Sequence, residues 1–179
     1  MGGALDRTRR RFLQAGFGAC ITLAASPVRA AYAPRSLGFL NLHTDERATI
    51  TYWANGEYVA DALREIDWLL RDHRTGEILP IDPNLLDLLH RLKQRLETEA
   101  PFHVISGYRS PATNAKLIEA GHGVAATSLH MQGQAIDIRI PERSLMSVRA
   151  AALSLESGGV GYYPKSDFVH VDVGRVRMW

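Results

Sequence analysis

The stretch Ser128-Leu129-His130-Met131-Gln132-Gly133-Gln134-Ala135-Ile136-Asp137 combines a polar loop with the start of a β-strand. His130 lies in the predicted loop, whereas Asp137 lies in a run from Ala135 to Ile140 in which apolar and polar residues alternate, as in a strand. Gly133 allows the chain to bend between the two residues. The imidazole and the carboxylate can therefore converge on one point.

A second histidine occurs near the end of the chain, within Asp167-Phe168-Val169-His170-Val171-Asp172, which also has the pattern of a strand. If this strand neighbours the first one, then His130, Asp137 and His170 can meet across the sheet. Three protein ligands leave one position of a tetrahedral ion open for water, and this separates a catalytic zinc site from a closed structural one. The pattern therefore predicts a catalytic metal centre.

Helical and strand patterns fill the rest of the chain, and no internal repeat is present. Asp82-Pro83, a capping residue followed by proline, opens the clearest helix, which carries a leucine stripe from Leu85 to Leu96. Because the late strands follow one another by hairpin-like returns, we predict an α+β fold with a small antiparallel sheet flanked by helices. The predicted strands span Leu37–Leu42, Ala48–Trp53, Phe102–Ile105, Ala135–Ile140, Val160–Tyr163 and Phe168–Val173, and the predicted helices span Ala60–Arg71, Pro83–Leu96, Pro111–Ala120 and Pro141–Leu155.

Composition limits the kind of partner. The 179 residues suit one compact domain with an appendage. The formal net charge is +2, but residues 1–33 contain five arginines and one aspartate, so the remainder of the chain is close to −2. Such a body lacks the basic surface that binds a phosphate backbone, and we expect no nucleic acid partner.

The first 33 residues have the features of an export signal. Thr8-Arg9-Arg10-Arg11-Phe12-Leu13-Gln14 resembles the twin-arginine motif, and the apolar run from Phe17 to Ala25 is too short to span a bilayer. Cleavage after Ala30 or Ala33 would leave a domain of residues 34–179 in the periplasm, without a stable membrane span. The expected partner for transport is the twin-arginine export machinery, and the alternative for this segment is a basic amphipathic anchor helix.

Cys20 is the only cysteine of the chain and lies inside this leader. The mature domain would therefore contain no disulfide and would draw its stability from its core or from a bound metal. Gly18-Ala19-Cys20 also offers an alternative reading as a lipoprotein cleavage box, with Phe17 where an aliphatic residue is expected.

A third motif, Ser106-Gly107-Tyr108-Arg109-Ser110, precedes the two histidine motifs. In this order the three motifs resemble those of the M15 zinc metallopeptidases, the D-alanyl-D-alanine metallopeptidase superfamily, and above all its murein endopeptidase K group. The resemblance implies a hedgehog/D-Ala-D-Ala peptidase-like site with one Zn²⁺ per chain, held by His130, Asp137 and His170. It also implies that Arg109 engages a substrate carboxylate or carbonyl oxygen, with Tyr108 beside it in substrate binding.

The general base has two candidates. Related M15 enzymes have a glutamate three residues before the last ligand, and Asp167 occupies that position here, so we favour Asp167 as the group that moves the proton. Asp172 is the competitor and is interpreted first as a carboxylate that orients an imidazole. Ser128 is interpreted as a loop-capping hydroxyl. Tyr162 and Tyr163 are expected either to line the cleft or to pack in the core. Five other histidines are interpreted as ordinary surface or core residues, namely His43, His73, His90, His103 and His122.

The resemblance implies metal-assisted hydrolysis of the peptide cross-links of peptidoglycan, including those that join two meso-diaminopimelate residues, during cell wall remodelling. Stem peptides and their cross-links are then the partners. One alternative is a D,D- or L,D-carboxypeptidase that trims stem peptides. The other is a non-catalytic wall-binding module that retains the metal pocket.

Overall fold

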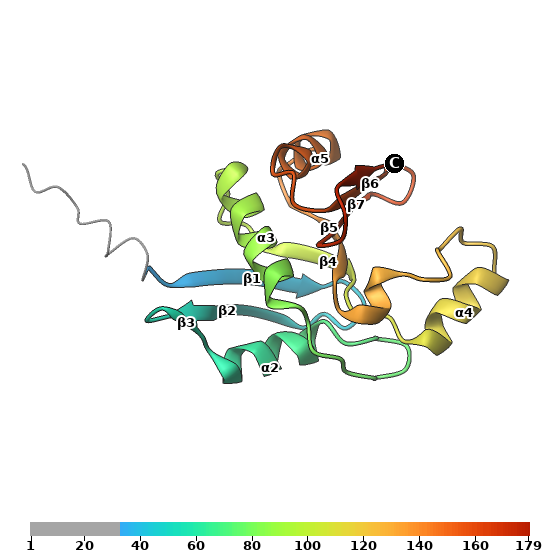
Figure 1. Cartoon of the computed structure of the whole chain (residues 1–179), viewed down its shortest axis with the longest axis horizontal. Helices are drawn as coiled ribbons and strands as arrows, with labels where there is room; N and C mark the ends of the chain where they lie inside the picture. Colours follow the sequence, from blue (N-terminus) through green and yellow to red (C-terminus); the bar gives the residue numbers. More distant parts are fainter. Residues whose placement is uncertain (1–32) are drawn as a thin grey trace, which may run out of the picture.

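One sheet runs through the described part of the chain, residues 33–179 of the computed structural model (Figure 1). Its strands are β1 (Arg35–Asn41), β2 (Arg47–Ala54), β3 (Glu57–Tyr58), β4 (Phe102–Ser106), β5 (Ala135–Arg139), β6 (Gly159–Tyr163), β7 (Phe168–Asp172) and β8 (Arg177–Met178). Their order across the sheet is β3-β2-β1-β4-β5-β7-β6-β8. The leader predicted over residues 1–33 lies, apart from its last residue, outside the described residues.

The sheet is mixed. β1 pairs with β4 and β6 pairs with β8 in parallel, while the other neighbouring strands are antiparallel. The α+β class is confirmed, but the antiparallel sheet that we predicted is wrong for these two pairs. β4 returns beside β1 after a long connection that contains two helices, and a parallel pair needs such a connection. β8 lies at the edge of the sheet, where it pairs in parallel with β6.

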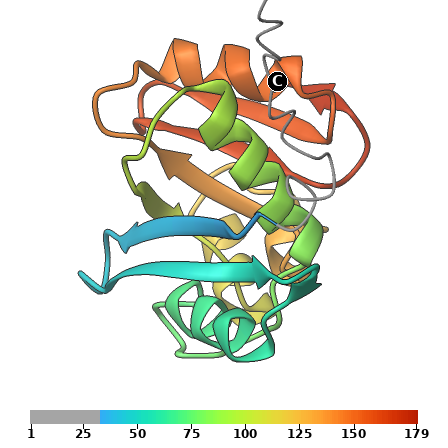
Figure 2. The ribbon, with the colours of Figure 1, turned by 90° about the vertical axis from the view of Figure 1, so that its left-hand side faces the viewer.

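Four α-helices and one 3₁₀ helix accompany the sheet within residues 33–179. They are α2 (Ala60–Leu69), α3 (Pro83–Arg95), α4 (Pro111–Glu119), α5 (Leu145–Ser154) and the 3₁₀ helix η1 (Leu129–Gln132). Figure 2 looks onto the face that α3 crosses, where α3 contacts β1 and α5. In Figure 1, α4 projects away from α3 and α5. Among these residues we find no helix with the length and apolarity needed to cross a membrane.

The predicted leucine stripe packs α3 onto the sheet. Asp82 caps this helix by accepting a hydrogen bond from the backbone N–H of Asn84, and the side chains of Leu85, Leu89 and Leu92 are completely buried. Burial of each leucine stabilises the fold by roughly 2 kcal/mol. The helix therefore holds β1 in place, and β1 pairs with β4, which leads directly into the Arg109 motif.

Some boundaries differ from the prediction. α5 begins at Leu145 rather than near Pro141, because Ser144 caps it by accepting from the N–H of Ser147 and Glu142 has a positive φ of 64° that a helix excludes. The short strands β3 and β8 and the single turn η1 were not predicted. Two residues are too few to display the alternation of a strand.

Candidate metal centre

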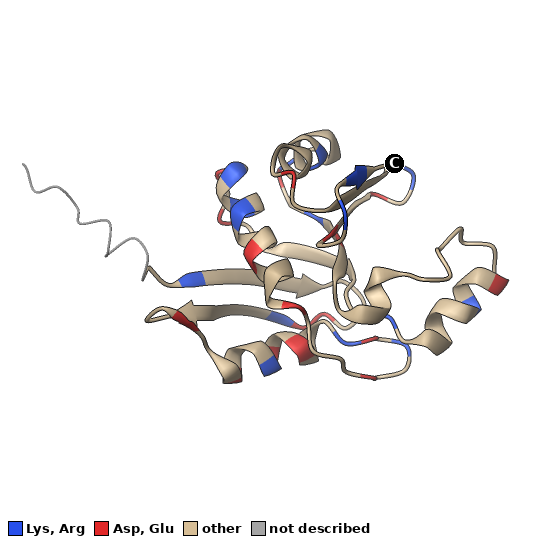
Figure 3. Cartoon of the chain, in the orientation of Figure 1, with Lys and Arg blue, Asp and Glu red and all other residues tan. Residues whose placement is uncertain are grey.

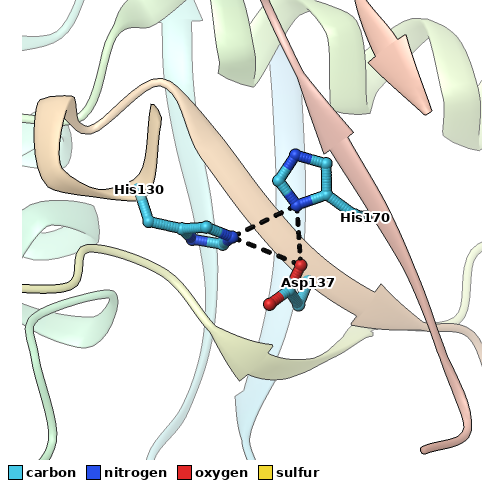
Figure 4. A group of neighbouring side chains, drawn as sticks. All are labelled: His130, Asp137 and His170. Carbon is cyan, nitrogen blue, oxygen red and sulfur yellow. Dashed lines mark hydrogen bonds and ion pairs between the residues drawn. The ribbon is translucent and has the colours of Figure 1, made fainter. Parts of the chain in front are cut away.

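Three side chains from separate elements meet at one point (Figure 4). His130 comes from η1, Asp137 from β5 and His170 from β7, and one donor atom of each lies within 4.8 Å of the others. Asp137 and His170 are direct partners in the antiparallel pairing of β5 with β7, so sheet register fixes their separation. Gly133 ends η1 with φ of 67°, and a Cβ there would lie 2.4 Å from the backbone oxygen of Pro80. Only glycine makes this turn toward Asp137 without strain.

The two imidazoles are oriented by hydrogen bonds on their outer nitrogens. Nδ1 of His130 lies 2.7 Å from the carbonyl oxygen of Gly107, and Nε2 of His170 lies 3.0 Å from Oδ2 of Asp172. Both oxygens are acceptors, so each of these nitrogens donates. In a neutral ring the other nitrogen then presents a lone pair to the centre.

These lone pairs converge with the carboxylate of Asp137. Nε2 of His130 lies 3.2 Å from Nδ1 of His170, and Oδ1 of Asp137 lies 2.8 Å from the latter and 3.3 Å from the former. Three electron-pair donors at such distances repel one another unless a cation or a proton lies between them. Two imidazoles and one carboxylate suit a divalent metal ion with an open position, so the residues fit the predicted zinc.

The electrostatics of the cluster favour the charged carboxylate. Burial alone would raise the pKa of Asp137, but the adjacent imidazoles of His130 and His170 hold it well below its usual range. Burial would lower the pKa of His170, and its hydrogen bonds to Asp137 and Asp172 reverse this and raise it. A metal ion binds the neutral imidazole, so metal binding weakens as the pH falls.

The carboxylate of Asp172 accepts hydrogen bonds from several groups. Besides His170, its carboxylate accepts from the backbone N–H groups of Gly159 and Gly174, and the guanidinium of Arg177 donates to both of its oxygens at 3.0 and 2.7 Å. Asp172 therefore makes the contact that an imidazole-orienting carboxylate requires. Arg177 could not be predicted from sequence, because nothing in a two-residue strand indicates which side chain it will contact.

Arg109 lies beside the cluster, just after β4. Its backbone N–H donates to the carbonyl oxygen of His130, and its Nη2 lies 3.6 Å from Oδ2 of Asp137. The guanidinium is buried, which lowers its pKa, and the carboxylate of Asp137 opposes that effect. Its remaining bonds, to Asn114 and Ser106, are long at 3.5 and 3.4 Å, and its Nε has no partner. A buried cation with unused donors is suited to bind an anionic group of a ligand.

A cleft of about 590 Å³ opens over this centre. His130, Asp137 and His170 form part of its lining, and Asp137 is the only acidic side chain among the described residues that line it. The lining also contains basic and aromatic side chains, namely His43, Arg74, Arg109, His122, Arg177, Tyr163, Phe168 and Trp179. The cleft is therefore suited to a ligand that carries negative charge.

Comparison with known proteins gives the family. The profile of the family described as peptidoglycan L,D-endopeptidase MepK matches residues 29–179. The chain belongs to this family. It is 41% identical to the peptidoglycan L,D-endopeptidase MepK of Escherichia coli strain K12 over 179 residues, which cover 97% of this chain and 98% of the relative. It is 38% identical over 180 residues to the probable MepK of Haemophilus influenzae, with coverage of 98% and 97%.

A solved structure, the L-Ala D-Glu endopeptidase ChiX of Serratia marcescens, has 18% sequence identity and a TM-score of 0.40, and the match covers 52% of this chain and 80% of that chain. This likeness is too distant to carry an argument. The family profile and the relatives confirm the murein endopeptidase K resemblance inferred from the three motifs.

Asp167 is not brought into the cluster of this MepK family member. Its side chain is more than half exposed, and its carboxylate pairs with Arg139. It occupies a turn with φ of 55° at the start of β7, between Ser166 and Phe168, both of which line the cleft. Asp167 therefore lies at the rim of the cleft, with its carboxylate engaged elsewhere.

The other predicted residues divide between cleft and core. Tyr108 belongs to the hydrophobic core and does not line the cleft, and Tyr162 packs against the same core. Tyr163 lines the cleft. Ser128 accepts a hydrogen bond from the backbone N–H of His130 and so caps η1. His43 and His122, interpreted from sequence as surface or core residues, both line the cleft, because the fold brings their loops to it.

Proposed function

We propose that this chain is an exported zinc metallopeptidase that hydrolyses peptide cross-links of peptidoglycan, including those between two meso-diaminopimelate residues. The observation that carries this proposal is the convergence of His130, Asp137 and His170 beneath a cleft, with both outer imidazole nitrogens occupied by acceptors. The names of the relatives support an endopeptidase of peptidoglycan. Remodelling of the cell wall is the corresponding role.

Zinc held by these three side chains would supply Lewis-acid polarisation of the scissile carbonyl and activation of water. Arg109 then contributes a fixed positive charge beside Asp137, in a buried setting where charge interactions are stronger than in water. Its free donors suit the substrate carboxylate or the developing oxyanion. The hydrogen bonds that the two imidazoles donate to Gly107 and Asp172 keep the ligand atoms aimed at the centre.

The charge of the cleft supports a stem-peptide substrate. Peptidoglycan stem peptides carry several carboxylates, and a cross-link between two diaminopimelate residues places one of them next to the scissile amide nitrogen. Arg74 and Arg109 line the cleft, and Asp137, its only acidic residue within the described chain, would be neutralised by the metal. An anionic peptide is therefore attracted to the cleft.

Chelation and digestion test this function together. We expect the purified protein to convert cross-linked muropeptide dimers to monomers, to lose this activity with a chelator, and to recover it with zinc, as followed by mass spectrometry. A linear stem peptide serves as the comparison. Trimming of the linear peptide without cleavage of dimers would instead identify a carboxypeptidase, and binding without any turnover would identify a wall-binding module.

We propose Asp167 as the proton acceptor on the basis of its position three residues before His170. In this role its carboxylate must leave Arg139 and turn into the adjacent cleft. We expect Asp167→Asn to lower kcat by about 10²-fold. Arg139→Gln, which only frees the carboxylate, is the matched control and should stay within about threefold of wild type. If Asp167→Asn also stays within that range, another group accepts the proton.

We also propose that residues 1–33 direct export by the twin-arginine machinery and that the enzyme acts in the periplasm, where its proposed substrate lies. The support is the motif around Arg9 and Arg10, together with the names of the relatives. Replacing both arginines by lysine is expected to leave the protein in the cytoplasm, as measured by cell fractionation. Unchanged periplasmic recovery of the double variant would exclude this route.

A further inference from the structure

Trp179 is a residue of the cleft to which neither the motifs nor the proposed chemistry give a role. It follows β8, and its ring lies 5.3 Å, centroid to centroid, from the imidazole of His170. The side chain lines the cleft and is 47% exposed. An aromatic ring that is half exposed beside a metal centre offers apolar surface to a ligand.

The ring is held in one orientation. Its Nε1–H donates to the hydroxyl of Tyr163 at 2.7 Å, and its backbone N–H and carbonyl bond to β6, at Val160 and Tyr162. The guanidinium of Arg177 lies 4.9 Å from the ring centroid. A Cβ on Gly161 would lie 2.7 Å from Cε2 of the ring, so the absence of a side chain at Gly161 makes room for Trp179.

Two further aromatic residues extend this surface. Tyr163 and Phe168 are partners in the β6–β7 pairing, their rings stack at 4.5 Å, and both line the cleft. We call Tyr163, Phe168 and Trp179 the aromatic wall. The strand order places β4, which leads to Arg109, on one side of the β5–β7 ligand pair, and β6 and β8 on the other. The cleft therefore has Arg109 on one side of the metal centre, and on the other the aromatic wall together with Arg177, which is paired with Asp172.

We propose that the aromatic wall binds the methylene chain of the diamino acid next to the scissile amide, and that Trp179 determines specificity for it. The inference rests on the proposed function. Diaminopimelate combines a carboxylate with the longest aliphatic segment of a stem peptide. Arg109 matches the carboxylate, and the fixed, half-exposed ring of Trp179 matches the methylene chain, whose burial favours binding.

The test separates KM from kcat. With a dimer cross-linked through diaminopimelate as substrate, we expect Trp179→Ala to raise KM about tenfold while kcat stays within about threefold of wild type. Trp179→Phe, which keeps an apolar ring, should raise KM less. The Ki of the monomeric product should rise in parallel with KM. Met178→Ala, an exposed neighbour on β8, is the matched control and should change neither constant.

Zinc content and melting temperature are measured for the same variants, because Trp179 lies close to His170. An unchanged KM and Ki in Trp179→Ala overturns the proposal. So does a loss of zinc or of kcat with KM unchanged, which would make Trp179 a support for His170 instead. If the wild-type protein cleaves no dimer, the proposed function fails. Calorimetric binding of the same dimer to wild type and Trp179→Ala still decides whether the aromatic wall contacts it.

Discussion

Replacing His170 by alanine is expected to abolish hydrolysis of cross-linked muropeptides, with kcat/KM reduced by at least about 10³-fold. The imidazole lies between Asp137 and Asp172, and without it only two of the three converging donors remain. A catalytic zinc site needs three protein ligands, so bound zinc should fall well below one ion per chain. Metal analysis of the purified variant, combined with digestion of dimers, measures both effects.

Two further variants make this result specific. His90→Gln changes a histidine on α3, outside the metal cluster, and should retain zinc and activity. Asp172→Asn leaves all three ligands in place but weakens the acceptor on Nε2 of His170, so we expect zinc affinity to fall by about 10–100-fold. Full activity of His170→Ala with zinc still bound would refute the ligand assignment.

Arg109→Gln should have the second largest effect, a loss of about 10²–10³-fold in kcat/KM with zinc content unchanged. The guanidinium is buried, its nearest carboxylate is Asp137 at 3.6 Å, and its Nε lacks a partner. A cation held in this way has donors free for the substrate, and its charge is poorly screened by water. Steady-state kinetics on dimers and metal analysis measure the two parts of this prediction.

Arg109→Lys separates charge from geometry. Lysine keeps the charge but lacks the planar fork that binds a carboxylate or oxyanion through two hydrogen bonds, so its activity should lie between those of wild type and Arg109→Gln. Arg64→Gln, on the exposed surface of α2, controls for the removal of an arginine elsewhere. A loss of zinc in Arg109→Gln would show that Arg109 supports the metal cluster rather than the substrate.

Local pattern was sufficient for most of the helices and strands. The leucine stripe and the Asp82-Pro83 cap predicted α3 because helix period and capping are properties of neighbouring residues. The same local patterns do not contain the pairing of β1 with β4, since that pairing depends on how the intervening helices pack. The start of α5 was misplaced because the capping of Ser144 outweighed the preference for proline in the first turn.

The sequence identified the three candidate metal ligands but not the position of the side chains around them. His130, Asp137 and His170 are chemically suited to zinc and occur in recognisable motifs, and the fold brings them together. Asp167 also had a suggestive position, yet its carboxylate pairs with Arg139. A side chain at a turn can point to either side of a strand, and spacing alone does not determine which side it takes.

From its sequence alone, this protein could be assigned its family, its α+β class, its proposed export signal and the three side chains that fit a metal. Those properties reside in short motifs and in residue chemistry. Only the tertiary structure decided which groups orient the imidazoles, where Arg109 lies, and that Trp179 borders the cleft. These contacts join residues from different strands, and sheet register and packing determine which of them meet.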